Sequence, residues 1–201
     1  MKIKSTLLVV LFLLGNAPVH GDTVAPRSNW SVFTGKYTSD GLPDEILMNQ
    51  PIEFQDAWIS VLNYGRHLSK PTPSRRWEAE AQFGIHRGLQ DHHEFNVAMI
   101  HRWSDWPWDG LIDTSFALGV GVSWAAEVPA LEAQGEPGEQ ATRTLLYLAL
   151  EFEAMPRHTR RWSVYGRIHH RSGVFGTIKG VHGGSDHVGI GLRWYPAATR
   201  Q

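Results

Sequence analysis

The chain has 201 residues, a formal net charge of −1 and no cysteine. This length suits one domain, and the lack of cysteine excludes a fold held by disulfides. Lysine and arginine are scattered, which excludes a nucleic-acid-binding protein. Nothing in the composition indicates a cofactor, and we predict none.

The first 21 residues have the pattern of a secretory signal peptide. Lys2 and Lys4 precede an apolar run, Leu7–Leu14, and Val19–Gly21 offers small residues at the cleavage positions. The run is too short to cross a bilayer as a helix. We therefore predict a signal peptide over residues 1–21 and a single domain over residues 22–201.

Beyond this segment, stretches of about ten residues alternate apolar and polar side chains, as half-buried strands do. The pattern is clear from the third stretch onward, apart from Ile100, but the first two stretches do not reveal their faces. The predicted strands are 30–38, 54–64, 77–86, 93–103, 116–124, 146–153, 162–172 and 186–195. Eight such strands without helices predict an all-β protein.

The polar faces of these strands combine small residues with charges. Small residues are Gly84, Ala117, Gly119, Gly121, Gly189 and Gly191, and charged ones are Glu78, Glu80, Arg143, Glu151, Arg167 and Arg193. A narrow lumen needs small residues and compensating charges, whereas a solvated exterior needs no glycines. Tryptophans also fall near strand ends, as in a membrane-interface girdle: Trp77, Trp103, Trp124, Trp162 and Trp194. The sequence thus predicts an eight-stranded antiparallel outer-membrane β-barrel over a soluble sandwich or a periplasmic lipid-binding barrel.

Three residues suited to ester hydrolysis lie on the apolar face near the ends of the last two strands. His170 and Ser172 share a face of one strand, and Asp186 begins the apolar face of the next. A histidine can deprotonate the serine, and a carboxylate can orient the imidazole. Backbone N–H groups around Gly173 are candidate oxyanion donors. With both termini periplasmic, the connections 39–53, 87–92, 125–141 and 173–184 face outward, and the trio faces the outer-leaflet lipid.

The stretch Ile168–Gly173, IHHRSG, followed by a loop, an acidic residue and a last apolar strand, resembles the PagL-type lipid A 3-O-deacylases. The resemblance covers residues 161–195. It implies an outer-membrane barrel in which His170 is the base, Ser172 the nucleophile and Asp186 the acid. It also implies hydrolysis of the ester-linked acyl chain at the 3 position of lipid A. The chain departs from the family in having Asp186 for a glutamate and Gly173 for an asparagine.

Other interpretations of the sequence remain open. A non-enzymatic outer-membrane barrel would carry structural or adhesive function in its long loops. The histidines His169, His170, His182 and His187 match no zinc motif, so we predict no metal. His92 and His93 are interpreted as an exposed loop pair, and Arg171 as a lumen or rim charge. The expected partners are lipid A or lipopolysaccharide and, for a homodimer, a second copy of the chain.

Overall fold

The computed structural model describes residues 28–38, 52–68, 72, 74–132, 141–159, 161–174, 177–178, 180–181 and 183–196. The predicted signal peptide lies outside these residues. Within them, no helix is long and apolar enough to cross a bilayer.

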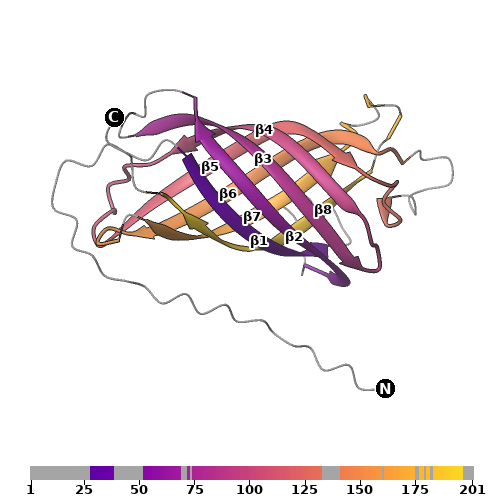
Figure 1. Cartoon of the computed structure of the whole chain (residues 1–201), viewed down its shortest axis with the longest axis horizontal. Coiled ribbons are helices and arrows are strands. Elements are labelled where there is room, and N and C mark those ends of the chain that lie inside the picture. The colour runs from indigo at the N-terminus through magenta and orange to yellow at the C-terminus, as the bar shows by residue number, and fades with distance from the viewer. Residues whose placement is uncertain are drawn as a thin grey trace, which may run out of the picture.

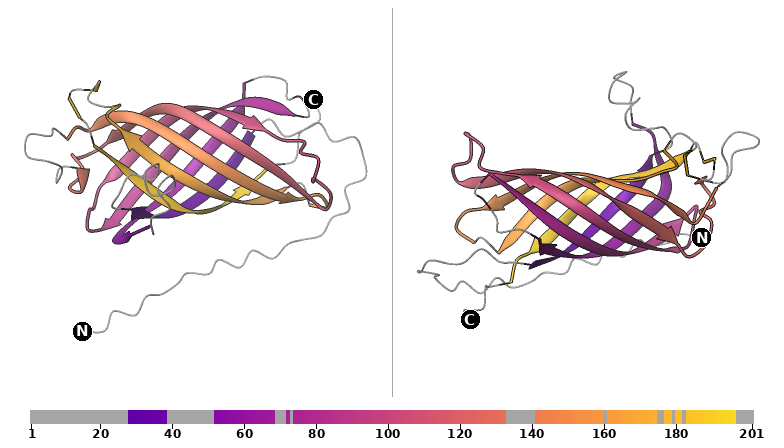
Figure 2. Two further views of the ribbon diagram at one scale, coloured as in Figure 1. Left: turned by 180° about the vertical axis from the view of Figure 1, so that it is seen from behind. Right: turned by 90° about the horizontal axis from the view of Figure 1, so that it is seen from above.

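Eight antiparallel strands close into one barrel, each hydrogen-bonded to the next and β1 to β8 (Figures 1 and 2). The strands are β1 Ser28–Thr38, β2 Phe54–His67, β3 Arg75–Gly88, β4 His93–Trp103, β5 Ile112–Ala125, β6 Thr144–Pro156, β7 Trp162–Ser172 and β8 Gly184–Trp194. We call the end where β1 begins and β8 ends the terminal end. The opposite end, which holds the β1–β2, β3–β4, β5–β6 and β7–β8 connections, is the loop end.

The outward face of the barrel is apolar around its waist. Large hydrophobic side chains at alternate strand positions remain exposed, among them Val32, Leu62, Phe83, Val97, Met99, Leu118, Val120, Phe152, Val164 and Ile190. A soluble barrel buries such residues, whereas a continuous outer belt of them matches lipid acyl chains. The prediction of an eight-stranded outer-membrane barrel is therefore confirmed.

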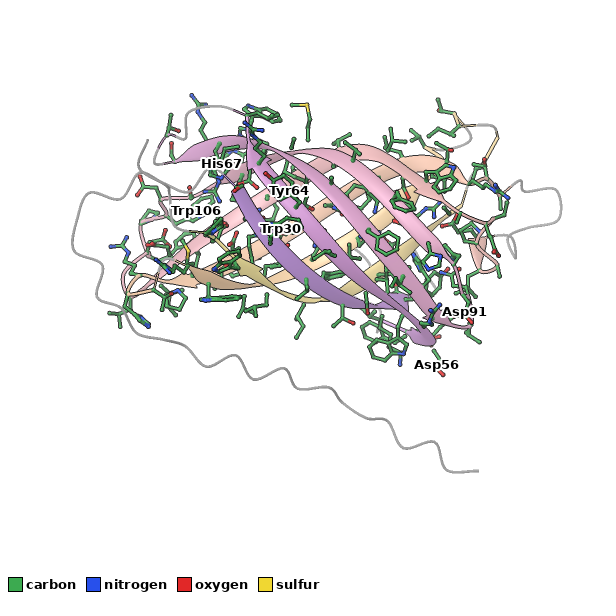
Figure 3. All side chains as sticks on the ribbon, in the orientation of Figure 1. Trp30, Asp56, Tyr64, His67, Asp91 and Trp106 are labelled. Carbon is green, nitrogen blue, oxygen red and sulfur yellow. The ribbon has the colours of Figure 1, made fainter. Side chains whose placement is uncertain are left out.

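Aromatic side chains gather at both rims of this belt, with Trp58 and Trp124 exposed near the loop end. At the terminal end, Trp30 packs on Tyr64 and Trp162 on Trp194, with ring centroids 4.8 and 6.2 Å apart. Figure 3 labels Trp30 and Tyr64 at this end, and Asp56 and Asp91 at the loop end. Aromatic rings are typical of the depth at which acyl chains meet headgroups.

The lumen is filled by an ion-pair network. Arg102 pairs with Glu78, Glu151 and Glu153, at 3.2, 2.7 and 2.8 Å. Further pairs join Arg167 to Glu80 and Glu151, Arg193 to Glu151 and Glu153, and Arg76 to Glu78. Buried charges are tolerated when they are paired in this way. The prediction that Arg143 belongs to the lumen was wrong, because this residue lies exposed just before β6.

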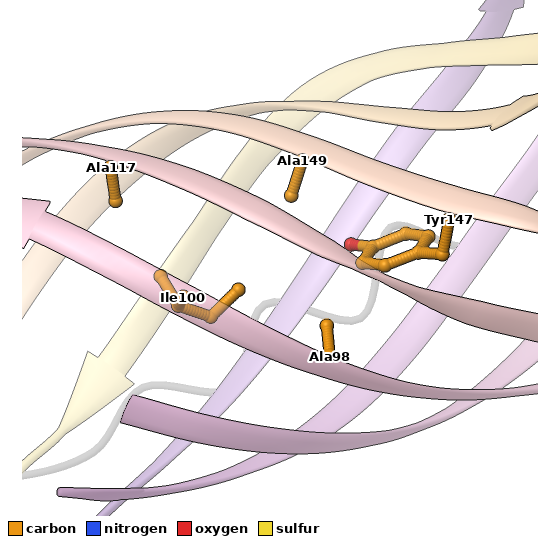
Figure 4. Packing of buried hydrophobic residues seen from close by; sticks show 5 residues of the cluster. All are labelled: Ala98, Ile100, Ala117, Tyr147 and Ala149. Atoms are coloured by element: carbon orange, nitrogen blue, oxygen red, sulfur yellow. The ribbon is translucent and has the colours of Figure 1, made fainter. Parts of the chain in front are cut away.

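Ile100, the residue that breaks the alternation of β4, points inward. It packs with Ala98, Ala117, Ala149 and Tyr147 (Figure 4). The small neighbours make room for it, since a Cβ added to Gly119 would lie 2.4 Å from the Ile100 Cδ1. Small lumen residues thus fit around a few large ones.

The sequences of β1 and β2 did not predict which face points into the lumen, because both faces carry hydrophobic side chains. Phe33, Ile59 and Val61 point inward and cluster with Tyr165 of β7. Val32 and Leu62 point outward to the belt. Period-two alternation of hydrophobicity vanishes where the lumen itself holds an apolar layer.

Candidate active site

The candidate site lies on the outward face of β7 and β8, at the loop end. In β7, Ser163, Tyr165, Arg167, His169 and Arg171 are buried in the lumen, so Ile168, His170 and Ser172 face outward. The register pairs His170 with Asp186 and Ser172 with Gly184. Two adjacent strand ends therefore position all three residues predicted from the sequence.

His170 and Asp186 are in direct contact. The His170 Nδ1 lies 2.7 Å from the Asp186 Oδ1, and the histidine side chain is 26% exposed against 7% for the aspartate. A carboxylate on Nδ1 fixes the tautomer that leaves the Nε2 lone pair free to accept a proton. The largely buried acid and the partly exposed imidazole thus have the arrangement of a base and its orienting group.

Ser172 lies two residues beyond His170 on the same face, about 7 Å along the strand. Its hydroxyl oxygen accepts a hydrogen bond of 3.0 Å from the Val174 N–H. Within the described part of the chain, no hydrogen bond joins it to His170. Catalytic hydrogen bonds often close only when substrate is bound, and rotation about the serine χ1 angle would redirect the hydroxyl.

The prediction for Gly173 needs a correction. Its N–H is not free for an oxyanion, because it donates to the Gly183 carbonyl at 3.1 Å. A glycine is needed here for a steric reason, since an added Cβ would lie 1.9 Å from the Val181 carbonyl oxygen. Gly173 lets the β7–β8 loop fold tightly against the end of β7.

A group behind the site was missed by sequence reasoning. Glu132, from the β5–β6 loop, accepts a 2.7 Å hydrogen bond from the Ser185 Oγ and lies 3.3 Å from the Arg171 Nε. Burial raises the pKa of Glu132, and Arg171 opposes that effect. Arg171 is buried and is therefore a lumen residue. Glu132 holds the β5–β6 loop against the strands that carry the site, and no local pattern in the sequence marks it.

The histidines considered for a metal do not converge as a group. His170 faces outward, His169 and His187 face the lumen, and His182 lies outside the described residues. A different inward group lies nearby, since ligand atoms of His86, His92 and Glu94 fall within 4.8 Å of one another. The prediction of an exposed His92 was wrong: the side chain is buried, and its ring stacks on His86 with centroids 4.0 Å apart.

No protein-family model matches the chain, and no curated protein matches it in sequence. Among solved structures, the outer membrane enzyme PagL is similar with a TM-score of 0.57 and 13% identity, covering 83% of this chain and 98% of that one. Neisserial surface protein A (NspA) is similar with a TM-score of 0.49 and 8% identity, covering 84% and 96%. At 13% identity the likeness to PagL shows the fold alone, an eight-stranded barrel.

Proposed function

We propose that this protein is an outer-membrane lipid A deacylase that hydrolyses the ester-linked acyl chain at the 3 position. The observation that carries the proposal is the contact between the His170 Nδ1 and the Asp186 Oδ1, on the lipid-facing side, with Ser172 on the same face. An acid–base pair that faces lipid suits a substrate whose ester lies in the membrane surface. The likeness to the fold of PagL is consistent with this assignment.

In the proposed mechanism, the His170 Nε2 takes the proton of the Ser172 hydroxyl as Oγ attacks the ester carbonyl. The tetrahedral intermediate collapses, the C–O bond to the sugar breaks, and the imidazolium gives its proton to the sugar oxygen. A water molecule, deprotonated by the same imidazole, then attacks the acyl carbon, the bond from that carbon to the Ser172 Oγ breaks, and the imidazolium returns its proton to Oγ as the fatty acid leaves. Asp186 remains ionised and stabilises the imidazolium in both halves.

Expression in a Gram-negative strain without lipid A deacylase activity tests the proposal. Mass spectrometry of the lipid A is expected to show loss of one 3-linked acyl chain, together with localisation of the protein to the outer membrane. Unmodified lipid A, with the protein folded and heat-modifiable on a gel, would instead favour a non-enzymatic barrel whose loops carry the function.

A lysine near the site supports an anionic substrate. Lys36 of β1 faces outward, with its Nζ 5.0 Å from the ring centroid of Trp58. It pairs in register with Val188, which pairs in turn with Ile168. Lys36 therefore lies about 10 Å across the sheet from the strand that carries His170. A headgroup phosphate of lipid A bound at the site is within reach of this ammonium.

Replacing Lys36 with glutamate is expected to raise KM for lipid A about ten-fold, the effect of losing one hydrogen bond to a charged group. The kcat should change little, because Lys36 lies away from the reacting atoms. Steady-state kinetics on lipid A in mixed micelles measures both values. Lys36→Arg is the matched control and should keep KM near that of the wild type. Equal KM values for all three proteins would exclude a contact between Lys36 and the substrate.

A further inference from the structure

A cluster of histidines lies in the lumen at the loop end of the barrel. His86 near the end of β3, His92 just before β4 and Glu94 in β4 place their ligand atoms within 4.8 Å of one another. The His86 Nε2 lies 2.8 Å from the Glu94 Oε2. All three side chains are buried, which distinguishes the cluster from the acidic groups common on protein surfaces.

In the described part of the chain, ring nitrogens in this cluster and beside it lack a hydrogen-bond partner. Among the described residues, no hydrogen bond reaches the buried His92 Nε2 or either ring nitrogen of His187. The His187 ring lies 5.0 Å from that of His86, between centroids. A buried polar atom without a partner costs about 1–3 kcal/mol. In the tautomer protonated at Nδ1, the lone pair on the His92 Nε2 is available to a cation that enters the cluster.

The surroundings of His86 and Glu94 fit the requirements of metal ligands. Glu94 Oε1 accepts hydrogen bonds from His169 Nε2 at 2.8 Å and from Asn96 Nδ2 at 2.7 Å, which fix the carboxylate. The Gln90 side-chain amide lies 3.3 Å from the His86 Nδ1, and its Oε1 has no partner among the described residues. With that amide turned over, Oε1 accepts a hydrogen bond from the Nδ1–H, and the unprotonated His86 Nε2 can bind a metal in place of its 2.8 Å contact with Glu94. Metal-bound histidines are commonly oriented by such a carbonyl on the other nitrogen.

The charge balance of the region also admits a dication. Arg171 lies 3.4 Å from Glu94 and opposes cation binding. Arg171 also forms an ion pair with Glu132, whose Oε1 lies 3.3 Å from the Arg171 Nε. One arginine between two carboxylates leaves a net charge of −1, so a cation entering beside Glu94 meets an attractive field.

We propose that His86, His92 and Glu94 bind a divalent transition-metal ion of the Zn²⁺ type inside the loop end of the barrel. Two imidazole nitrogens and a carboxylate oxygen are ligands that Zn²⁺ accepts, with water in a fourth position. Coordination requires the His92 ring to turn from its stack on His86 while its backbone carbonyl keeps the 2.9 Å hydrogen bond from the His86 N–H. The ion ties the β3–β4 connection to Glu94 and, through His169, to β7. This proposal does not depend on the deacylase assignment.

The test uses untagged protein in detergent micelles, stripped with a chelator and titrated with Zn²⁺. Elemental analysis after dialysis is expected to find about one zinc per chain. His92→Ala should weaken binding at least ten-fold, an effect of about the size expected for loss of a metal-site residue. His93→Ala is the matched control, because His93 faces outward and stacks on Phe83, with centroids 5.7 Å apart. X-ray absorption of the zinc-loaded wild type should show imidazole ligands and does not depend on any variant folding.

Three results would overturn the proposal. They are no stoichiometric zinc in the wild type, zinc without imidazole in its absorption spectrum, and equal loss of binding in the His92 and His93 variants. None of these results bears on deacylation, which is measured separately by lipid A mass spectrometry.

Discussion

Replacing Ser172 with alanine is expected to reduce lipid A deacylation by at least about 10³-fold, since the reaction then lacks its nucleophile. The barrel should fold normally, because the Ser172 side chain faces outward and its hydroxyl makes only the 3.0 Å contact with the Val174 N–H among the described residues. Mass spectrometry of lipid A and heat-modifiability of the protein on a gel measure activity and folding in one preparation.

Two further variants separate catalysis from packing. Asp186→Asn keeps the shape of the side chain but no longer stabilises the imidazolium or fixes the tautomer of His170, and a loss of about 10⁴-fold is expected. Ser60→Ala removes an exposed, outward serine of β2 and should leave activity intact. If Ser172→Ala retained activity like Ser60→Ala, another group would have to be the nucleophile and the proposed mechanism would fail.

Local alternation was sufficient to predict the barrel and the place of the trio. His170 and Ser172 share a strand face because they are two residues apart in a strand. The antiparallel register then brings Asp186 opposite His170. These are short-range consequences of chain geometry, so a sequence carries them directly. The same alternation predicts the inverted arrangement, with Gly119 and Glu151 inside and Leu118 and Leu150 outside.

Contacts between strands that are distant in sequence could not be predicted from the sequence. Ile59 and Phe33 point into the lumen because Tyr165 lies across from them, and nothing in β1 or β2 reveals that neighbour. The sequence predicts an exposed loop position for His92, whereas its side chain is buried against His86. Glu132 approaches the site only because the β5–β6 loop brings it to the lumen side of β8, where it meets the buried Ser185. In each case tertiary packing decides where the side chain lies, and the local sequence pattern does not predict it.

The largest effect on stability is expected from the lumen. Arg102 is fully buried and pairs with three carboxylates, those of Glu78, Glu151 and Glu153. Arg102→Met keeps much of the volume but leaves buried carboxylates without that charge, so the free energy of unfolding should fall by about 3–5 kcal/mol. Equilibrium unfolding in urea, with the protein in lipid vesicles, measures this change. Arg87→Met is the control: its partner Asp91 is 3.4 Å away, both side chains are about two-thirds exposed, and a loss below about 1 kcal/mol is expected.

A double variant tests whether charge balance or packing causes the loss. The network counts four arginines (Arg76, Arg102, Arg167, Arg193) against four glutamates (Glu78, Glu80, Glu151, Glu153). Removing Arg102 leaves an excess of one negative charge, and adding Glu78→Gln restores equal numbers. The two losses should therefore sum to more than the loss in the double variant, with a coupling of about 0.5–3 kcal/mol. Strict additivity would mean that Arg102 and Glu78 are not coupled, and the loss in Arg102→Met would then come from its other contacts, those with Glu151 and Glu153.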